Sequence, residues 1–162
     1  MPTNFDVAPP LFRQLMGRFA TGVTVITATD AETGAPRGMT ASSVASVSLA
    51  PPLLSVCVEM EAALHDLFIQ SPIFAVNVLA EDQEELSRRF AGPQIATFDG
   101  VGYHTSERGL VLLDGAVAHI ECRRAATHTA GDHTILLGGV IGGGAHDARP
   151  LLHFRGGYAG LG

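Results

Sequence analysis

Hydrophobic residues occur along the chain in a series of short segments that are typical of β-strands. Residues 22–29, GVTVITAT, and residues 43–49, SVASVSL, alternate apolar or β-branched residues with small polar ones. Residues 51–58, PPLLSVCV, and 72–80, PIFAVNVLA, are apolar almost throughout, which predicts buried strands. Four further strand-like segments with glycine turns follow: GLVLL, GAVAHIECRRAATH, DHTILLGGVIG and PLLHFRGGY.

Three segments have the patterns of short helices. Residues 10–20 place apolar side chains on one helical face, after a proline that suits a first turn. Residues 61–71 are helix-like, and residues 81–91 begin with acids and end near arginines, which complements a helix dipole. About eight to ten strands and three helices predict a mainly β protein, an antiparallel β-barrel with peripheral helices. The length and the lack of a linker-like stretch predict one domain over residues 1–162.

The composition limits what the protein contacts. Hydrophobic residues make up 46% of the chain and charged residues only 16%. A domain of this size cannot bury that much apolar surface within itself, so we expect a homodimer with an apolar interface. A net charge of −6 disfavours nucleic acid and anionic membranes as partners. No apolar run is long enough to span a membrane, and no signal peptide is evident. Cys57 and Cys122 lie in separate strand-like segments, as free thiols of a cytoplasmic protein would.

All ten basic residues are arginines, and the absence of lysine excludes Schiff-base chemistry. A bound phosphate would have to be met by arginine, hydroxyls or backbone N–H groups. No cysteine or histidine pattern has the spacing of metal ligands, so we expect no metal site. No nucleophile elbow is present, and the glycine-rich residues 138–144 follow β patterning, which predicts a hairpin turn and not a dinucleotide fingerprint.

Residues 38–43, GMTASS, are small or hydroxylated and lie between apolar segments. A core strand would carry more bulk and a surface turn more Asn, Asp or Pro, so this segment predicts a wall that a ligand approaches closely.

Four other features have two interpretations each. Asn77 within an apolar strand either bonds a neighbouring loop or contacts a ligand. His133 in GDHT is either a surface residue at a hairpin corner or a residue that faces a pocket. Tyr158 in HFRGGY either belongs to a frayed tail or closes a site, and the arginines of SRRF either oppose the helix dipole or reach a phosphate.

With these residues assembled, the chain resembles the short-chain flavin reductases, the reductase components of two-component flavin monooxygenases. The resemblance extends over residues 12–158 in six segments: FATGVTVITA, GMTASSVASVSLAPPLLSVCV, FAVNVLAEDQEELSRRFAG, LDGAVAHIEC, GDHTILLGGV and PLLHFRGGY. It implies an FMN-binding split β-barrel with flavin at a dimer interface. The implied activity is hydride transfer from NADH or NADPH to FMN or FAD, with reduced flavin supplied to a partner monooxygenase.

The resemblance also implies roles for individual residues. One group is expected to surround the flavin: Met39, Thr40, Ala41, Ser42, Ser43, Cys57, Val58, Asn77, Arg89, Phe90 and Ala91. Arg89 is the expected phosphate partner within this group. His133 and Tyr158 match positions near the nicotinamide, and His133 is expected to orient that ring as the catalytic residue.

One segment departs from the family pattern. Where the family carries a Ser/Thr-rich loop after the VCV strand, this chain has EMEAALHD, with Glu59 and Glu61 and no hydroxyl. Two acids beside a flavin phosphate are unfavourable, so either this loop points away or flavin binds more weakly. This departure motivates a second hypothesis, a non-catalytic flavin carrier or sensor, and a third is an interaction protein with a vestigial site.

Overall fold

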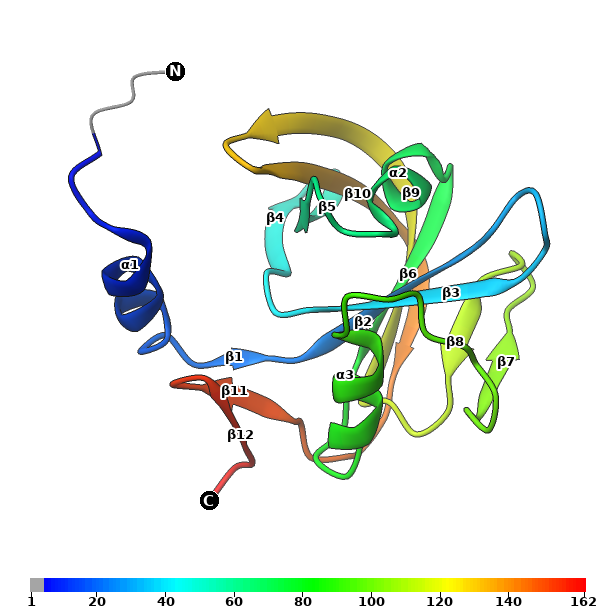
Figure 1. The fold of residues 1–162 in the computed structure, drawn as a ribbon. Coiled ribbons are helices and arrows are strands. Elements are labelled where there is room, and N and C mark those ends of the chain that lie inside the picture. The colour runs from blue at the N-terminus through cyan, green and yellow to red at the C-terminus, as the bar shows by residue number, and fades with distance from the viewer. Residues whose placement is uncertain (1–4) are drawn as a thin grey trace.

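A computed structural model describes residues 5–162 and contains one large antiparallel sheet. Its strand order is β3-β2-β6-β9-β10-β5-β4. The strands are β2 (Thr24–Thr29), β3 (Pro36–Ala41), β4 (Ala45–Leu49), β5 (Pro52–Glu59), β6 (Ile73–Val78), β9 (Ala118–Ala130) and β10 (His133–Ala145). The sheet is strongly curved, and β3 approaches β5 across its hollow side (Figure 1).

The mainly β prediction is confirmed, but within the described residues the strands do not form a closed hydrogen-bonded barrel. β3 and β4 are the two edges of the large sheet, although they follow one another along the chain. Only residues 42–44 separate β3 from β4, and this short connection passes from one edge to the other. The gap between these edges is where the sheet remains open.

Two small sheets extend the fold. β1 (Thr21–Gly22) pairs with β11 (Leu152–Phe154), which pairs with β12 (Gly157–Ala159), so the strand after α1 lies beside the C-terminal hairpin (Figure 1). β7 (Tyr103–Thr105) and β8 (Val111–Leu113) form a hairpin.

Helices form at all three predicted places but are shorter than predicted. They are α1 (Pro9–Met16), α2 (His65–Gln70) and α3 (Glu84–Phe90). No residue of α1 is buried, and it lies apart from the large sheet in Figure 1. α3 packs beside β3 and β2. None of the helices in residues 5–162 is long and apolar enough to cross a membrane.

The hydrophobic core divides into two main clusters. The larger one lies within the curve of the large sheet and includes Ile26, Val56, Phe68 and Phe74. The second lies beneath α3 and β8 and is built from Val23, Val25, Leu79, Phe90, Leu113 and Leu151. The first cluster makes the inner wall of the sheet rigid, and the second fixes α3 against it.

The prediction of a hairpin turn at residues 138–144 is wrong, because β10 runs through this segment. Gly138 explains why glycine occurs within the strand. A Cβ there would lie 2.7 Å from the Phe74 ring and 3.0 Å from Cβ of Cys122, too close for any side chain. The pairing of β10 with β9 also shifts register at two points, after Leu137 and after Val140. The glycines therefore accommodate close packing and bulges within one long strand.

Candidate functional site

A cavity of about 640 Å³ opens between β3, the end of β5, the segment before α2 and the segment after α3. Its lining includes most of the residues that the sequence suggested for a ligand site. The lining residues are Gly38, Met39, Thr40, Ala41, Ser42, Ser43, Cys57, Glu59, Glu61, Ala62, Ala63, Leu64, Phe90, Ala91, Gly92, Pro93, Gln94, Ile95 and His133.

GMTASS forms one wall of this cavity. Gly38 packs closely against α3, because a Cβ at this position would lie 3.0 Å from two atoms of the Phe90 ring. Ala41 is buried, whereas Ser42 and Ser43 are exposed where β3 has ended. The short side chains of this wall project little into the cavity. Gly38 also lets the Phe90 ring of α3 pack close to the wall.

Two hydroxyls of this wall are already used within the protein. Thr40 Oγ1 donates to the Ser87 carbonyl at 2.7 Å, which ties β3 to α3. Ser43 Oγ donates to the Cys57 carbonyl at 3.2 Å and accepts from the Cys57 amide at 3.1 Å. Within residues 5–162, the Ser42 hydroxyl has no such partner. The wall therefore offers a ligand mainly this hydroxyl and backbone groups.

Cys57 and Val58 lie on opposite faces of β5, because successive strand residues point in opposite directions. Cys57 is half-buried and lines the cavity. Val58 is fully buried in the core, so the structure does not bring it to the cavity. The other free thiol, Cys122, is also in the core, where burial, and then the charge of Glu121, raise its pKa to about 12.

His133 lies at the cavity rim, where β10 begins opposite Glu59 of β5. Its Nδ1 is 2.7 Å from Asp132 Oδ1, and this hydrogen bond together with the ring's charge lowers the pKa of the Asp132 carboxyl. Nε2 has no protein partner among the described residues. The side chain is 41% exposed. Asp132 thereby orients the imidazole, and Nε2 remains for a ligand.

Arg89 is directed away from the cavity. Its Nη1 donates to the carbonyls of Thr97, at 3.2 Å, and Asp99, at 2.8 Å. The guanidinium thus ties α3 to the segment that leads to β7. Phe90 and Ala91, the next two residues, do line the cavity.

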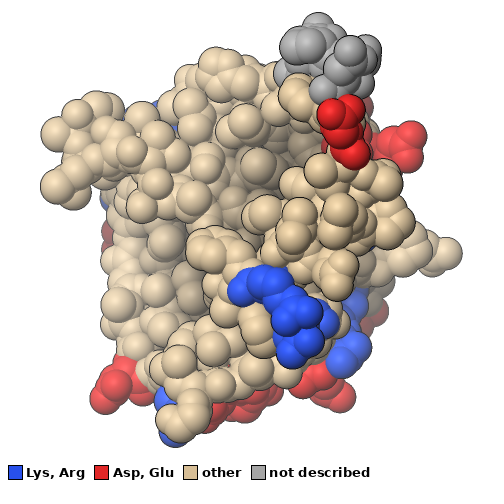
Figure 2. All heavy atoms as spheres, turned by 90° about the vertical axis from the view of Figure 1, so that its left-hand side faces the viewer, with Lys and Arg blue, Asp and Glu red and all other residues tan. Residues whose placement is uncertain are grey.

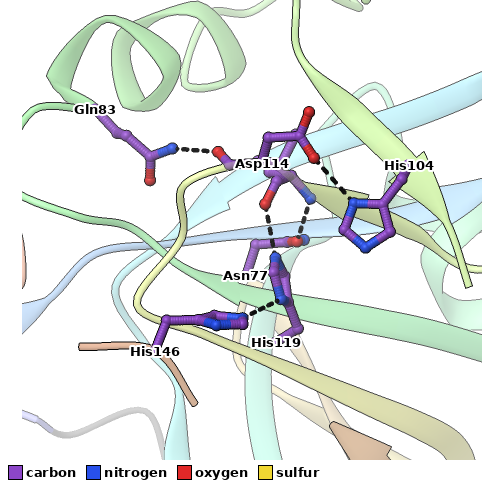
Figure 3. Close-up of polar contacts among 7 residues, drawn as sticks. Asn77, Gln83, His104, Asp114, His119 and His146 are labelled. Carbon is purple, nitrogen blue, oxygen red and sulfur yellow. Dashed lines mark hydrogen bonds and ion pairs between the residues drawn. The ribbon is translucent and has the colours of Figure 1, made fainter. Parts of the chain in front are cut away.

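Asn77 is completely buried, and its side chain hydrogen-bonds to the backbone of β8 (Figure 3). Its Nδ2 donates to the Val25 carbonyl at 2.9 Å and to Thr27 Oγ1 at 3.0 Å. Its Oδ1 accepts from the Leu113 amide at 2.8 Å. These side-chain hydrogen bonds join β2, β6 and β8. Of the two interpretations of Asn77, bonding to a neighbouring segment and contact with a ligand, the structure therefore agrees with the first. The structure does not bring Asn77 to the cavity.

The same polar region holds three histidines that the sequence gave no reason to group. His119 Nε2 donates to the Leu113 carbonyl at 2.6 Å, and His146 Nε2 lies 3.3 Å from His119 Nδ1 (Figure 3). His104 Nδ1 lies 2.9 Å from Asp114 Oδ1. No cluster in residues 5–162 has the arrangement of a metal site. Of these contacts, the bond between His119 of β9 and Leu113 of β8 holds the β7–β8 hairpin on the sheet.

Tyr158 contacts α3 and does not line the cavity. Its hydroxyl is 2.7 Å from Ser87 Oγ, and the Arg88 guanidinium lies 4.9 Å from the centre of its ring. Since Ser87 also accepts the bond from Thr40, Tyr158 supports the wall through α3. It is not a lining residue in this chain.

Some lining residues were missed by sequence reasoning. Residues 92–95 and 62–64 complete the cavity with glycine, proline, apolar side chains and the amide of Gln94. Such residues have no chemical signature, and only the folded position of these segments reveals them. Glu59 and Glu61, which depart from the family pattern, are both among the lining residues.

Comparison with known proteins identifies this architecture. The family model described as the flavin reductase like domain matches residues 16–162. FMN reductase (NADH) SmoA of Agrobacterium fabrum is 44% identical over 149 residues, covering 92% of this chain and 83% of the relative. NADH-dependent FAD reductase of Streptomyces globisporus is 45% identical over 150 residues, covering 90% and 81%.

Solved structures agree with these relatives. NADH:FAD oxidoreductase SgcE6 of Streptomyces globisporus, in complex with NAD and FAD fragments, superimposes with a TM-score of 0.89 at 38% identity, covering 98% of both chains. Flavin reductase PheA2 in its native state gives a TM-score of 0.88 at 41% identity, covering 96% of this chain and 99% of that one. This chain therefore belongs to the family of proteins built on the flavin reductase like domain.

Proposed function

We propose that this protein is an NADH-dependent flavin reductase that transfers a hydride from NADH to FMN or FAD. The observation that carries the proposal is the cavity, which combines a wall of small residues with a rim histidine in a chain of this family. The similar proteins from Agrobacterium and Streptomyces are named as NADH-dependent reductases of FMN and FAD. Nothing in the comparisons favours a non-catalytic carrier or sensor.

The cavity fits a flavin. The low wall at residues 38–43 accommodates a flat ring system, and its free backbone groups and the Ser42 hydroxyl suit the polar ring edge. When bound, the flavin supplies the atom that accepts the hydride. Phe90, packed against Gly38, and Ile95 add apolar side chains to the lining. His133 Nε2, oriented by Asp132, is placed to hold a polar group of the nicotinamide.

Steady-state turnover tests this proposal. Anaerobic NADH oxidation is followed at 340 nm with FMN and FAD separately, for the wild type and for His133→Ala. We expect oxidation that depends on flavin, and a KM for NADH that rises about tenfold in the variant, as loss of one hydrogen bond predicts. Absence of flavin-dependent oxidation would contradict the function, and an unchanged KM would contradict only the role of His133.

We also propose that the active form is a homodimer of single-domain subunits. α1 buries none of its residues, and Leu11, Phe12, Leu15, Met16 and Phe19 are about half exposed or more. The face turned to the viewer in Figure 2, on the α1 side of Figure 1, is mostly uncharged and hollowed. An apolar face of this kind favours pairing with a second copy.

The physiological partner proposed for the reduced flavin is a monooxygenase. The support is that a 38% identical relative from Rhodococcus jostii is named as the reductase subunit of a flavin-dependent monooxygenase. A cytoplasmic location stays a prediction, consistent with two free cysteines.

A further inference from the structure

We propose that the cavity recognises the ring system and ribityl chain of a flavin but that the carboxylates of its wall repel the phosphate. Riboflavin is therefore bound at least as tightly as FMN. This inference rests on the proposed function and concerns which flavin the same site prefers. Its basis is the distribution of charge around the cavity.

The negative part of the wall is fixed in place. Glu59 is the last residue of β5, and Glu61 lies two residues further on, so both carboxylates belong to one short segment. The Met60 amide donates to the Asp132 carbonyl at 2.9 Å, and the Ala62 amide donates to the Glu59 carbonyl at 3.1 Å. The backbone that carries the two acids is thus bound to the residue before β10 and to itself, and both residues line the cavity.

No arginine of the same subunit lies in the lining to balance these acids. Across residues 5–162, which contain all ten arginines, no arginine lines the cavity. Three arginines lie within two residues of a lining residue in the sequence, and each is engaged elsewhere. Arg37, next to Gly38, has Nη2 3.6 Å from Asp30 Oδ2. Arg88 donates to Glu84 Oε1 from Nε at 2.9 Å and from Nη2 at 2.7 Å. Arg89 donates to the carbonyls of Thr97 and Asp99.

Arginines do gather at a different place. A separate pocket of about 370 Å³ is lined by Arg13 and Arg18 of the α1 region and by Arg155 of the β11–β12 turn. It shares no lining residue with the cavity. The chain thus concentrates cations away from the site that holds the flavin.

These charges discriminate between flavins. A phosphate monoester carries a charge of about −1.5 to −2 at neutral pH, and carboxylates in the same cavity repel it. The hydroxyls of a ribityl chain are hydrogen-bond donors, and a carboxylate accepts such bonds strongly. The wall that disfavours the phosphate is therefore compatible with the uncharged chain that riboflavin and FMN share.

Flavin binding without NADH isolates this preference. Quenching of flavin fluorescence gives Kd values for riboflavin and FMN with the wild type and with the double variant E59Q/E61Q. The matched control is E32Q/E107Q, which removes the same charge from exposed residues outside the cavity. We expect riboflavin to bind the wild type at least as tightly as FMN. We also expect E59Q/E61Q to tighten FMN about 3- to 10-fold while changing riboflavin less than twofold.

The outcomes separate this inference from the proposed function. Binding of FMN more than tenfold tighter than riboflavin by the wild type, or a ratio that E59Q/E61Q leaves unchanged, would overturn the inference alone. Equal changes in E32Q/E107Q would also overturn it, because the effect would then reflect net charge. Failure of both flavins to bind, together with no flavin-dependent NADH oxidation, would overturn the proposed function and the inference with it.

Discussion

At the scale of single residues, Asn77 shows how a polar side chain in a strand can serve structure instead of a ligand. It supplies the amide of Leu113 with its acceptor and binds Val25 and Thr27 on the neighbouring strand. Figure 3 shows the same region completed by His119 and Gln83. Leu113 lies in the short strand β8. The Asn77 side chain supplies its amide with the acceptor that a neighbouring strand would otherwise provide.

We therefore predict that Asn77→Ala lowers stability without changing flavin affinity. The variant leaves the buried Leu113 amide without an acceptor, which costs about 1–3 kcal/mol, and creates a small cavity. Urea denaturation measures the loss, and flavin fluorescence measures the Kd. Gln70→Ala, at an exposed position on α2, is the control. Weaker flavin binding with unchanged stability would show instead that Asn77 contacts the ligand.

At the scale of elements, α3 connects the C-terminal hairpin to the cavity wall. Ser87 of α3 accepts from Thr40 of β3 through its carbonyl, and its hydroxyl meets the Tyr158 hydroxyl of β12. Ser87 is fully buried, so these bonds form out of contact with water. The position of the wall thus depends on residues from three distant parts of the chain.

A double-mutant cycle tests this connection. Tyr158→Phe removes one hydroxyl and leaves the Ser87 hydroxyl buried without its partner, so we expect a loss of about 1–2 kcal/mol in unfolding free energy. Ser87→Ala in the Tyr158→Phe background should then cost little, with a coupling energy of about 1 kcal/mol. Denaturant unfolding of all four proteins gives the values. Additive losses, or a raised KM for NADH at unchanged stability, would favour direct contact of Tyr158 with the nicotinamide.

The elements themselves were largely predictable from the sequence, and the reasons for the failures are specific. Strand patterns located β2, β5, β6 and β9, because the side-chain period of two is local information. The prediction of a hairpin turn at residues 138–144 failed, because the Phe74 ring that leaves no room for a side chain at Gly138 is distant in the sequence. The resemblance placed Cys57 and His133 at the cavity but also Val58 and Arg89, whose directions depend on tertiary contacts.

At the scale of the whole molecule, many of the exposed apolar side chains that the composition predicts lie on or next to α1. Leu15 and Phe12 of α1 are more than half exposed, and Phe19, beyond its end, is 70% exposed. Isolated exposed apolar residues are ordinary, but these lie together on an element that buries nothing in its own subunit. A short helix with no buried residue in its own subunit has little to stabilise it, so a second subunit is the natural source of both burial and helicity.

We predict that the 16.9 kDa chain forms a dimer in solution and that Leu15→Glu dissociates it, because a carboxylate at this position would be buried without a partner on assembly. Light scattering after size exclusion, from about 1 to 100 µM, should show an apparent dissociation constant raised by about 10²-fold or more, since burying an unpaired charge costs several kcal/mol. Ala31→Glu adds the same charge in an exposed turn and should remain dimeric. A monomeric wild type would refute the dimer, whereas a Leu15→Glu protein as dimeric as the wild type would place the interface on another face.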